Sequence, residues 1–290
     1  MSAPLLQMQD VFKRVPGKYA LNGLDFSVPS GQVVGLLGRN GAGKTTLLEC
    51  ALGLRDIERG EIRLFGEAPA QMTDNSRARI GYVPQQTDLF EWLSAPQMLA
   101  FFKAFYPRWN DAKVDALMQR WSIPLTVPIG RLSVGEKQRL AIIRALAHDP
   151  EFLILDEPVA SLDPAGRRDF LRELVERTIE SETTVVFSTH ILSDLERVAA
   201  DVAFMREGKI ILRQPLDALE EQTRRLIGPA TALPPGLFRE ELARCVDSSG
   251  IVNVLARLSE PERMLAGGLA AQGVRTEAVG LEDLFIEATQ

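Results

Sequence analysis

A glycine-rich segment that carries one lysine is the strongest chemical signal in the sequence. It matches the pattern G-x-x-x-x-G-K-[ST] and consists of Gly38, Arg39, Asn40, Gly41, Ala42, Gly43, Lys44 and Thr45. Glycines allow a backbone to wrap a phosphate, and a helix that begins after them points its N–H groups at the anion. Lys44 can reach the β- and γ-phosphates, Thr45 can bind Mg²⁺, and Thr46 adds a second hydroxyl. The segment therefore predicts a site for a nucleoside triphosphate.

A pair of acidic residues follows an apolar run later in the chain. Asp156 and Glu157 come directly after residues 152–155. Asp156 suits a magnesium shell, because hard cations take oxygen ligands, and Glu157 is placed to orient or deprotonate an attacking water. Alone, such a pair is more often a solvated strand end. The glycine-rich segment is what makes the functional interpretation the stronger one.

A third segment, 132–139, reads locally as the start of a helix. Ser133 is a good N-cap and Glu136 stands three residues later, which together form a capping box. This structural interpretation is sufficient by itself. A helix N-terminus that carries Ser133 and Gly135 can also hold a phosphate.

The elements that position these residues alternate along the chain. Short apolar runs predict strands at 33–37, 80–83, 152–155, 184–187 and 202–205. Helical patterns lie between them, notably at 44–54 and 164–181, so we expect an α/β fold with a parallel sheet. The stretch from about 88 to 140 is mainly helical and contains several prolines, and we read it as a helical subdomain inserted into this core.

The composition changes near residues 229–236, which read as a loop or linker. Beyond it, strands are expected at 252–255 and 274–279, and helices at 260–272 and 281–289. We therefore predict a large domain over 1–225 and a small C-terminal α/β domain over 226–290.

The overall composition limits the class of protein. The chain has 33 Lys and Arg against 39 Asp and Glu, a net charge of −6, which argues against a nucleic-acid partner. Cys50 and Cys245 are too few for a disulfide framework and are expected to be free and mostly buried. The first ten residues do not resemble a signal peptide, and no apolar run approaches the ~18 residues of a spanning helix. Any membrane part is expected to come from other chains.

The motifs in this order resemble the ATP-binding subunit of ABC transporters over residues 5–225. In that family the glycine-rich segment is the Walker A loop, 82–85 the Q-loop, 132–139 the signature, 153–157 Walker B, 161–163 the D-loop and 188–190 the H-loop. The resemblance implies a P-loop NTPase (ABC ATPase) core. Residues 281–285 and 105–110 are similar to segments of export-type subunits, in which the ATPase and the membrane domain are separate chains.

The resemblance also implies cofactors, partners and roles. ATP and Mg²⁺ would bind, and the subunit would sit on the cytoplasmic face of a membrane, working with transmembrane permease subunits. It would pair with a second ATP-binding subunit, identical or related. The implied catalytic residues are Glu157, His190 and Gln85, and the implied magnesium residues are Thr45, Gln85 and Asp156. Ser133 and Gly135 would contact the partner's nucleotide, and Asp163 would link the two sites.

The sequence departs from the family pattern at two places. Val134 and Glu136 replace a glycine and a glutamine of the signature. The family has an aromatic residue that stacks on adenine. Matching residues 11–14 to the family pattern places Val15 at that position, and Tyr19 is the alternative.

A soluble ABC-type ATPase, such as an iron–sulfur assembly factor, is the main alternative function. Such a factor lacks an extension like 229–290, so an exporter subunit is the favoured prediction. Chromosome or translation ATPases carry two ATP domains or long coiled coils, and this chain has neither. The transported substrate is not encoded in this subunit, because the membrane subunits select it.

Overall fold

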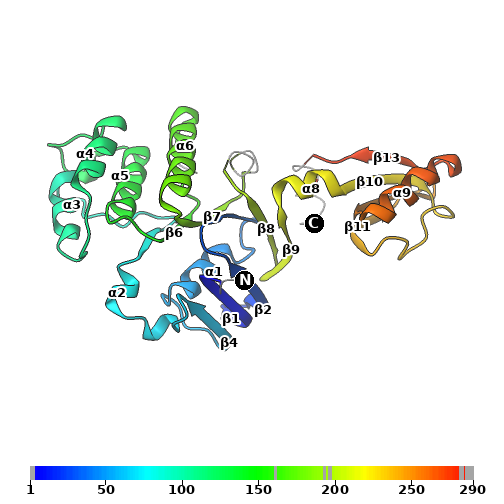
Figure 1. The fold of residues 1–290 in the computed structure, drawn as a ribbon, viewed down its shortest axis with the longest axis horizontal. Helices are drawn as coiled ribbons and strands as arrows, with labels where there is room; N and C mark the ends of the chain where they lie inside the picture. The colour runs from blue at the N-terminus through cyan, green and yellow to red at the C-terminus, as the bar shows by residue number, and fades with distance from the viewer. Residues whose placement is uncertain (1–3, 160–161, 192–193, 195–197, 281–283, 285–290) are drawn as a thin grey trace. The chain divides into compact units, whose positions relative to one another are not determined.

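The computed structural model describes residues 4–159, 162–191, 194, 198–280 and 284. The chain divides into two compact units, 1–212 and 213–290; two of its sheets belong mainly to the first unit and one to the second (Figure 1). The boundary expected at 225/226 lies inside a strand of the second unit. No helix in the described part of the chain has both the length and the apolar character that crossing a bilayer requires.

The central sheet of the first unit has six strands in the order β5-β6-β7-β3-β8-β9. Their bounds are β3 Val33–Leu37, β5 Ile80–Val83, β6 Phe152–Asp156, β7 Thr184–Thr189, β8 Asp201–Arg206 and β9 Lys209–Pro215. The first five in that order pair in parallel, as the fully apolar runs predict. The carboxyl ends of β3 and β6 therefore open toward the same edge, where the glycine-rich loop and the acidic pair follow them.

A second sheet in the same unit is antiparallel, with the order β2-β1-β4. Its strands are β1 Leu6–Val15, β2 Lys18–Val28 and β4 Arg59–Leu64. β1 and β2 form a hairpin whose turn contains Gly17 at φ 83°, a backbone conformation that glycine adopts without strain. Leu24 and Leu6 of this sheet join Leu47 and Leu48 of the following helix in one buried core.

The α-helices described in the first unit are α1 Lys44–Ala51, α2 Asp74–Arg77, α3 Ala95–Lys103, α4 Asp111–Arg120, α5 Val134–Leu146 and α6 Pro164–Ser181, with short 3₁₀ turns at Pro69–Gln71 and Ile129–Arg131. Most of them start at a residue whose side chain caps them, whereas α1 starts after Gly43 without such a cap. α3, α4 and α5 lie side by side as the expected helical subdomain (Figure 1). Ser133 caps α5 through the predicted capping box with Glu136. The predicted helix 164–181 is confirmed at both ends.

The second unit is a four-stranded antiparallel sheet, order β11-β12-β10-β13, with one longer helix packed on it. Its elements are α8 Leu216–Gln222, β10 Thr223–Pro229, β11 Glu240–Val246, β12 Ile251–Arg257, α9 Glu260–Gly268, a 3₁₀ turn Leu269–Gln272 and β13 Arg275–Ala278. Leu226, Val254, Phe238 and Leu269 form its separate core. The expected helix 281–289 lies outside the described residues except for Leu284, which is buried.

The two cysteines differ in environment. Cys50 is buried in α1, and burial raises the pKa of its thiol to about 11. Cys245 is free and exposed, so the expectation that both thiols are mostly buried is wrong for this residue. The reason is its place near the end of β11, an edge strand with no neighbour on one side.

Candidate nucleotide-binding site

The glycine-rich loop between β3 and α1 is held in a shape that only glycine permits at two positions. Gly43 has φ 111°, and a Cβ built on it would lie 2.3 Å from the backbone oxygen of Ala20. A Cβ on Gly38 would lie 2.6 Å from the oxygen of Met205. The loop is thus wedged between β2 and β8, and α1 directs its N-terminus into the space above the loop.

Lys44 is buried, with its ammonium group inside the loop. Nζ donates to the oxygen of Gly38 at 2.7 Å and lies 3.4 Å from Oε1 of Glu157. A buried cation needs an anionic partner, and here one carboxylate and the carbonyl dipoles supply it. Phosphate oxygens carry more charge than either partner, so this ammonium group is suited to bind them.

Asp156 ends β6 and is completely buried. Burial raises the pKa of its carboxyl, and hydrogen bonds from Ser188 and Thr45 oppose that change. Ser188 Oγ donates to Oδ1 at 2.5 Å, whereas Oδ2 is buried without a well-formed hydrogen bond among the described residues. A buried carboxylate oxygen left in this way, beside the Thr45 hydroxyl, fits the requirement of a magnesium site.

Glu157 follows with φ 49°, in the left-handed region, which turns its carboxylate toward Lys44. Its Oε2 lies 3.3 Å from Nδ1 of His190 and accepts a long hydrogen bond of 3.5 Å from Nε2 of Gln85. The three side chains that the sequence assigns to catalysis therefore meet at one carboxylate, although Gln85 lies 72 residues before Glu157.

A cavity of about 330 Å³ opens beside this cluster. It is lined by Val15, Lys18, Ala20, Asn40, Gly41, Gly43, Lys44, Thr45, Thr46, Gln85 and Glu157. Most of these are residues that the sequence motifs single out. Gly38, Arg39 and Ala42 shape the loop without lining the cavity, and His190 reaches the site through Glu157.

The two candidates for the adenine contact are placed differently. Val15 lines the cavity. Tyr19 does not: its ring lies edge-on to Phe12, and Arg14 sits 4.5 Å from the ring centroid and donates to the Tyr19 hydroxyl at 2.6 Å. These contacts hold the tyrosine ring away from the cavity.

Lys18 and Ala20 line the cavity but belong to none of the motifs found in the sequence. Side chains alternate along a strand, so residues 18 and 20 of β2 share the face opposite Tyr19. That alternation is the signal that could have identified them. Lys18 Nζ donates to the oxygen of Gly41 at 3.1 Å, so a second ammonium group lies at the mouth of the loop.

The signature residues and Asp163 are absent from this cavity. Ser133 is exposed, and its hydroxyl donates to Oε2 of Glu136 at 2.7 Å. Hydrogen bonds from Ser133 lower the pKa of Glu136. Asp163 caps α6 through the N–H groups of Ala165 and Gly166 and accepts from Arg139. Ser161, the other polar residue of the expected D-loop, lies outside the described residues.

Comparisons with known proteins agree with this arrangement. The ABC transporter family model matches residues 21–160. The Nod factor export ATP-binding protein I of Burkholderia orbicola is 32% identical over 100% of this chain and 98% of its own. The bacitracin transport ATP-binding protein BcrA of Bacillus licheniformis is 32% identical over 98% of this chain and 96% of its own. A solved ATP-binding subunit of an ABC transporter matches with TM-score 0.68 and 27% identity, covering 75% of this chain and 92% of its own.

The chain belongs to the ABC transporter family. It is an ATP-binding and ATP-hydrolysing subunit, and its α/β core with an inserted helical subdomain is that of an ABC ATPase. The relatives align along the whole chain, including the second unit, and are named for transport. The alternative of an iron–sulfur assembly factor is therefore not favoured.

The geometry explains how an ABC ATPase can use these residues. Lys44 and residues of the glycine-rich loop line the cavity, and an ammonium group beside backbone N–H groups is suited to the charge of a triphosphate. The Glu157 carboxylate borders the same cavity and can accept a proton from water. The candidate group for binding phosphate, Lys44 Nζ, and the candidate proton acceptor, Glu157 Oε1, are thus different side chains 3.4 Å apart.

Proposed function

We propose that this chain is the ATPase subunit of an exporter whose transmembrane part consists of separate permease subunits, and that it works on the cytoplasmic face of the membrane. The observation that carries the proposal is the match along nearly the whole chain to two subunits named for Nod factor export and bacitracin transport. None of the described helices is suited to span a bilayer. The proposal therefore assigns the permease function to partner chains.

In the proposed reaction Glu157 orients the attacking water and accepts its proton. Lys44 and the loop amides hold the β- and γ-phosphates, and His190, whose Nδ1 already faces the Glu157 carboxylate, contacts the γ-phosphate. Magnesium would be held by Thr45, Asp156 and Gln85, and it supplies charge neutralisation for the phosphates when bound. The buried, unsatisfied oxygen of Asp156 supports this assignment.

A second ATP-binding subunit, identical or related, completes the site. Ser133 and Gly135 lie at the N-terminus of α5 and do not line this chain's own cavity, although their residue types suit a phosphate. The exposure of Ser133 supports a role of this segment toward the partner's nucleotide, with Asp163 proposed to lie between the two sites.

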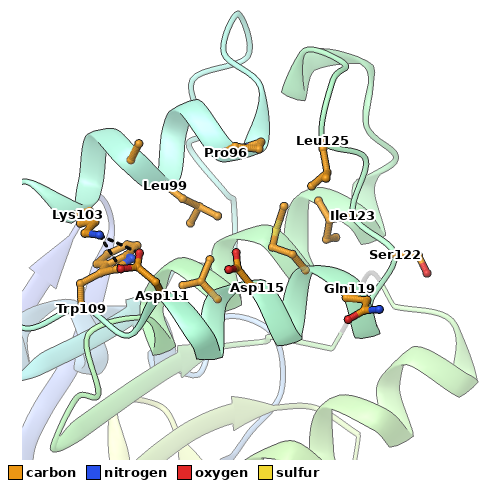
Figure 2. A pocket seen from close by; sticks show the side chains of 13 residues that line it. Pro96, Leu99, Lys103, Trp109, Asp111, Asp115, Gln119, Ser122, Ile123 and Leu125 are labelled. Atoms are coloured by element: carbon orange, nitrogen blue, oxygen red, sulfur yellow. Dashed lines mark hydrogen bonds and ion pairs between the residues drawn. The ribbon is translucent and has the colours of Figure 1, made fainter.

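The permease is proposed to dock on the helical subdomain. An apolar groove of about 710 Å³ lies between α3 and α4, with Leu99, Ile123 and Leu125 pointing into it (Figure 2). The subdomain also carries exposed aromatic rings outside the groove: Trp92 is 75% exposed and Phe105 is 66% exposed. Because exposed apolar patches of this kind mark interaction sites, the groove fits a short amphipathic helix of a membrane subunit. The segment from Gln85 to α3 connects this surface directly to the catalytic carboxylate.

Co-purification from detergent-solubilised membranes tests the proposal. The wild-type chain is expected to retain a multi-spanning partner, and Leu125→Glu to lose it while still binding ATP. Met264→Glu is the matched control, because Met264 is an exposed apolar residue of the second unit. Recovery of the chain without any membrane protein would instead support the soluble alternative.

A further inference from the structure

A buried serine connects the two acidic residues of the site. Ser188 lies in β7, two residues before His190, and is fully buried. Its Oγ donates to Oδ1 of Asp156 at 2.5 Å and accepts from the backbone N–H of Glu157 at 2.9 Å. The backbone oxygen of Ser188 is a second, longer acceptor for the same N–H at 3.2 Å.

The pairing of the strands explains why the serine is at this point. β6 and β7 are parallel neighbours, and Asp156 is paired with Ser188 in their register. The hydroxyl has one hydrogen, and it donates this hydrogen in the hydrogen bond to the Asp156 carboxylate. Its lone pair then faces the N–H of Glu157. The hydroxyl therefore fixes the Asp156 side chain and the Glu157 backbone at the same time.

Both fixed groups need such support. Glu157 has φ 49°, which a residue with a side chain adopts only when its surroundings hold it there. The Asp156 carboxylate is completely buried, and its rotation decides whether Oδ2 faces the Thr45 side of the cavity. A small shift at either residue would move the base or the magnesium ligand away from the phosphates.

We infer that Ser188 is a positioning residue for ATP hydrolysis, which aligns the proton-accepting carboxylate of Glu157 and the Asp156 carboxylate through one hydroxyl group. It acts through these two residues and is absent from the residues that line the cavity. This role goes beyond the proposed transport function and does not depend on the exported substrate or on the permease.

Three substitutions separate the hydroxyl group from simple packing. Ser188→Ala removes the hydroxyl. Ser188→Thr and Ser188→Val both add a methyl-sized group, but only threonine keeps the hydroxyl. Supporting residues of this kind typically contribute 10- to 100-fold. We expect Ala and Val to lower kcat by about that factor with the KM for ATP within about twofold, and Thr to recover most of the loss.

A second measurement does not depend on turnover. Titration of a fluorescent ATP analogue at several magnesium concentrations is expected to show a roughly tenfold higher magnesium requirement for Ser188→Ala, with magnesium-free affinity unchanged. Thermal unfolding of each variant confirms that it is folded. A kcat of Ser188→Ala within twofold of wild type, or equal losses for Thr and Val, would overturn the inference. Absence of ATP hydrolysis by the wild-type chain would count against the ATPase function itself.

Discussion

Nζ of Lys44 lies 3.4 Å from Oε1 of Glu157, and both side chains are at least nine-tenths buried. The cation that would meet the phosphates is thus already paired with the carboxylate that would activate water. A bound γ-phosphate and this carboxylate compete for one ammonium group and repel each other. The same pair therefore links the affinity for ATP to the rate of its hydrolysis.

Glu157→Gln is expected to separate the two properties. The amide keeps the shape of the side chain but accepts no proton, and loss of a general base typically lowers the rate ~10²–10⁴-fold. ATP should bind at least as tightly, because Lys44 loses a competing anion. We expect an ATP-bound dimer to accumulate in size-exclusion chromatography with ATP and Mg²⁺, while phosphate release is very slow. Near-normal phosphate release would move the base elsewhere, with His190 as the first candidate.

Removal of the Lys18 ammonium group, which lies at the mouth of the glycine-rich loop, should weaken nucleotide binding. Lys18→Ala is expected to raise the Kd for ATP roughly fivefold, about 1 kcal/mol for a partly solvated contact to phosphate. Lys18→Arg should keep the affinity near wild type, because the charge remains. Calorimetric titration with ATP checks both variants.

Tyr19→Ala is expected to leave the affinity for ATP unchanged, because Phe12 and Arg14 hold the ring outside the cavity. The same titration, run beside Val15→Ala, tests this prediction. A severalfold loss for Tyr19→Ala would mean that the ring turns inward and stacks on the base when nucleotide binds.

Ser133→Arg should block the ATP-dependent pairing of two subunits without affecting nucleotide binding by the monomer. Ser133 is exposed at the start of α5 and lies outside the cavity, so the monomer should bind ATP as the wild type does. In a Glu157→Gln background, the ATP-dependent dimer should disappear from the elution profile. A large loss of monomer affinity would place Ser133 in its own chain's site.

His148 should make stability depend on pH. Its ring stacks on Tyr106 at 4.0 Å, and burial lowers the pKa of the imidazole to about 4. The unfolded chain then binds more protons between about pH 4 and 6.5, so stability falls as the pH decreases through this range. From pH 7 to 5 the loss from this group is about 2 kcal/mol.

His148→Gln has no group that titrates in that range. Urea unfolding at pH 7 and pH 5 should therefore show a smaller difference for the variant than for the wild type. Equal differences would show that the imidazole is protonated in the folded protein.

The sequence predicted the five parallel strands of the central sheet because they contain mostly apolar, buried runs. It did not predict β9, which is only partly buried and carries charged residues. The antiparallel sheet was harder to predict. β1 contains register shifts near Met8 and Val11 that break the alternation of buried and exposed residues. The domain boundary was expected at 225/226, whereas the second unit begins at 213 and already includes α8 and the start of β10.

Most residues that line the cavity could be picked out from the sequence, because the glycine-rich motif fixes both residue type and spacing. Lys18 could not be found in that way, since its role depends on the face of a hairpin strand. Ser188 directly follows an apolar run and begins the H-loop segment, whose resemblance gives this serine no role of its own. Only the register with Asp156 shows what it contacts. Side-chain roles that depend on pairing between strands are therefore the ones that local sequence patterns leave out.

The wedged phosphate loop has a thermodynamic consequence. Gly208 accepts a hydrogen bond from Asn22 and donates one to Ala42, so the turn between β8 and β9 ties the loop to β2. A loop that is ordered before the nucleotide arrives loses little backbone entropy on binding. The free energy released by the phosphate contacts then remains available for bringing two subunits together. The tight packing around Gly38 and Gly43 thus reduces the entropic cost of binding ATP at this loop.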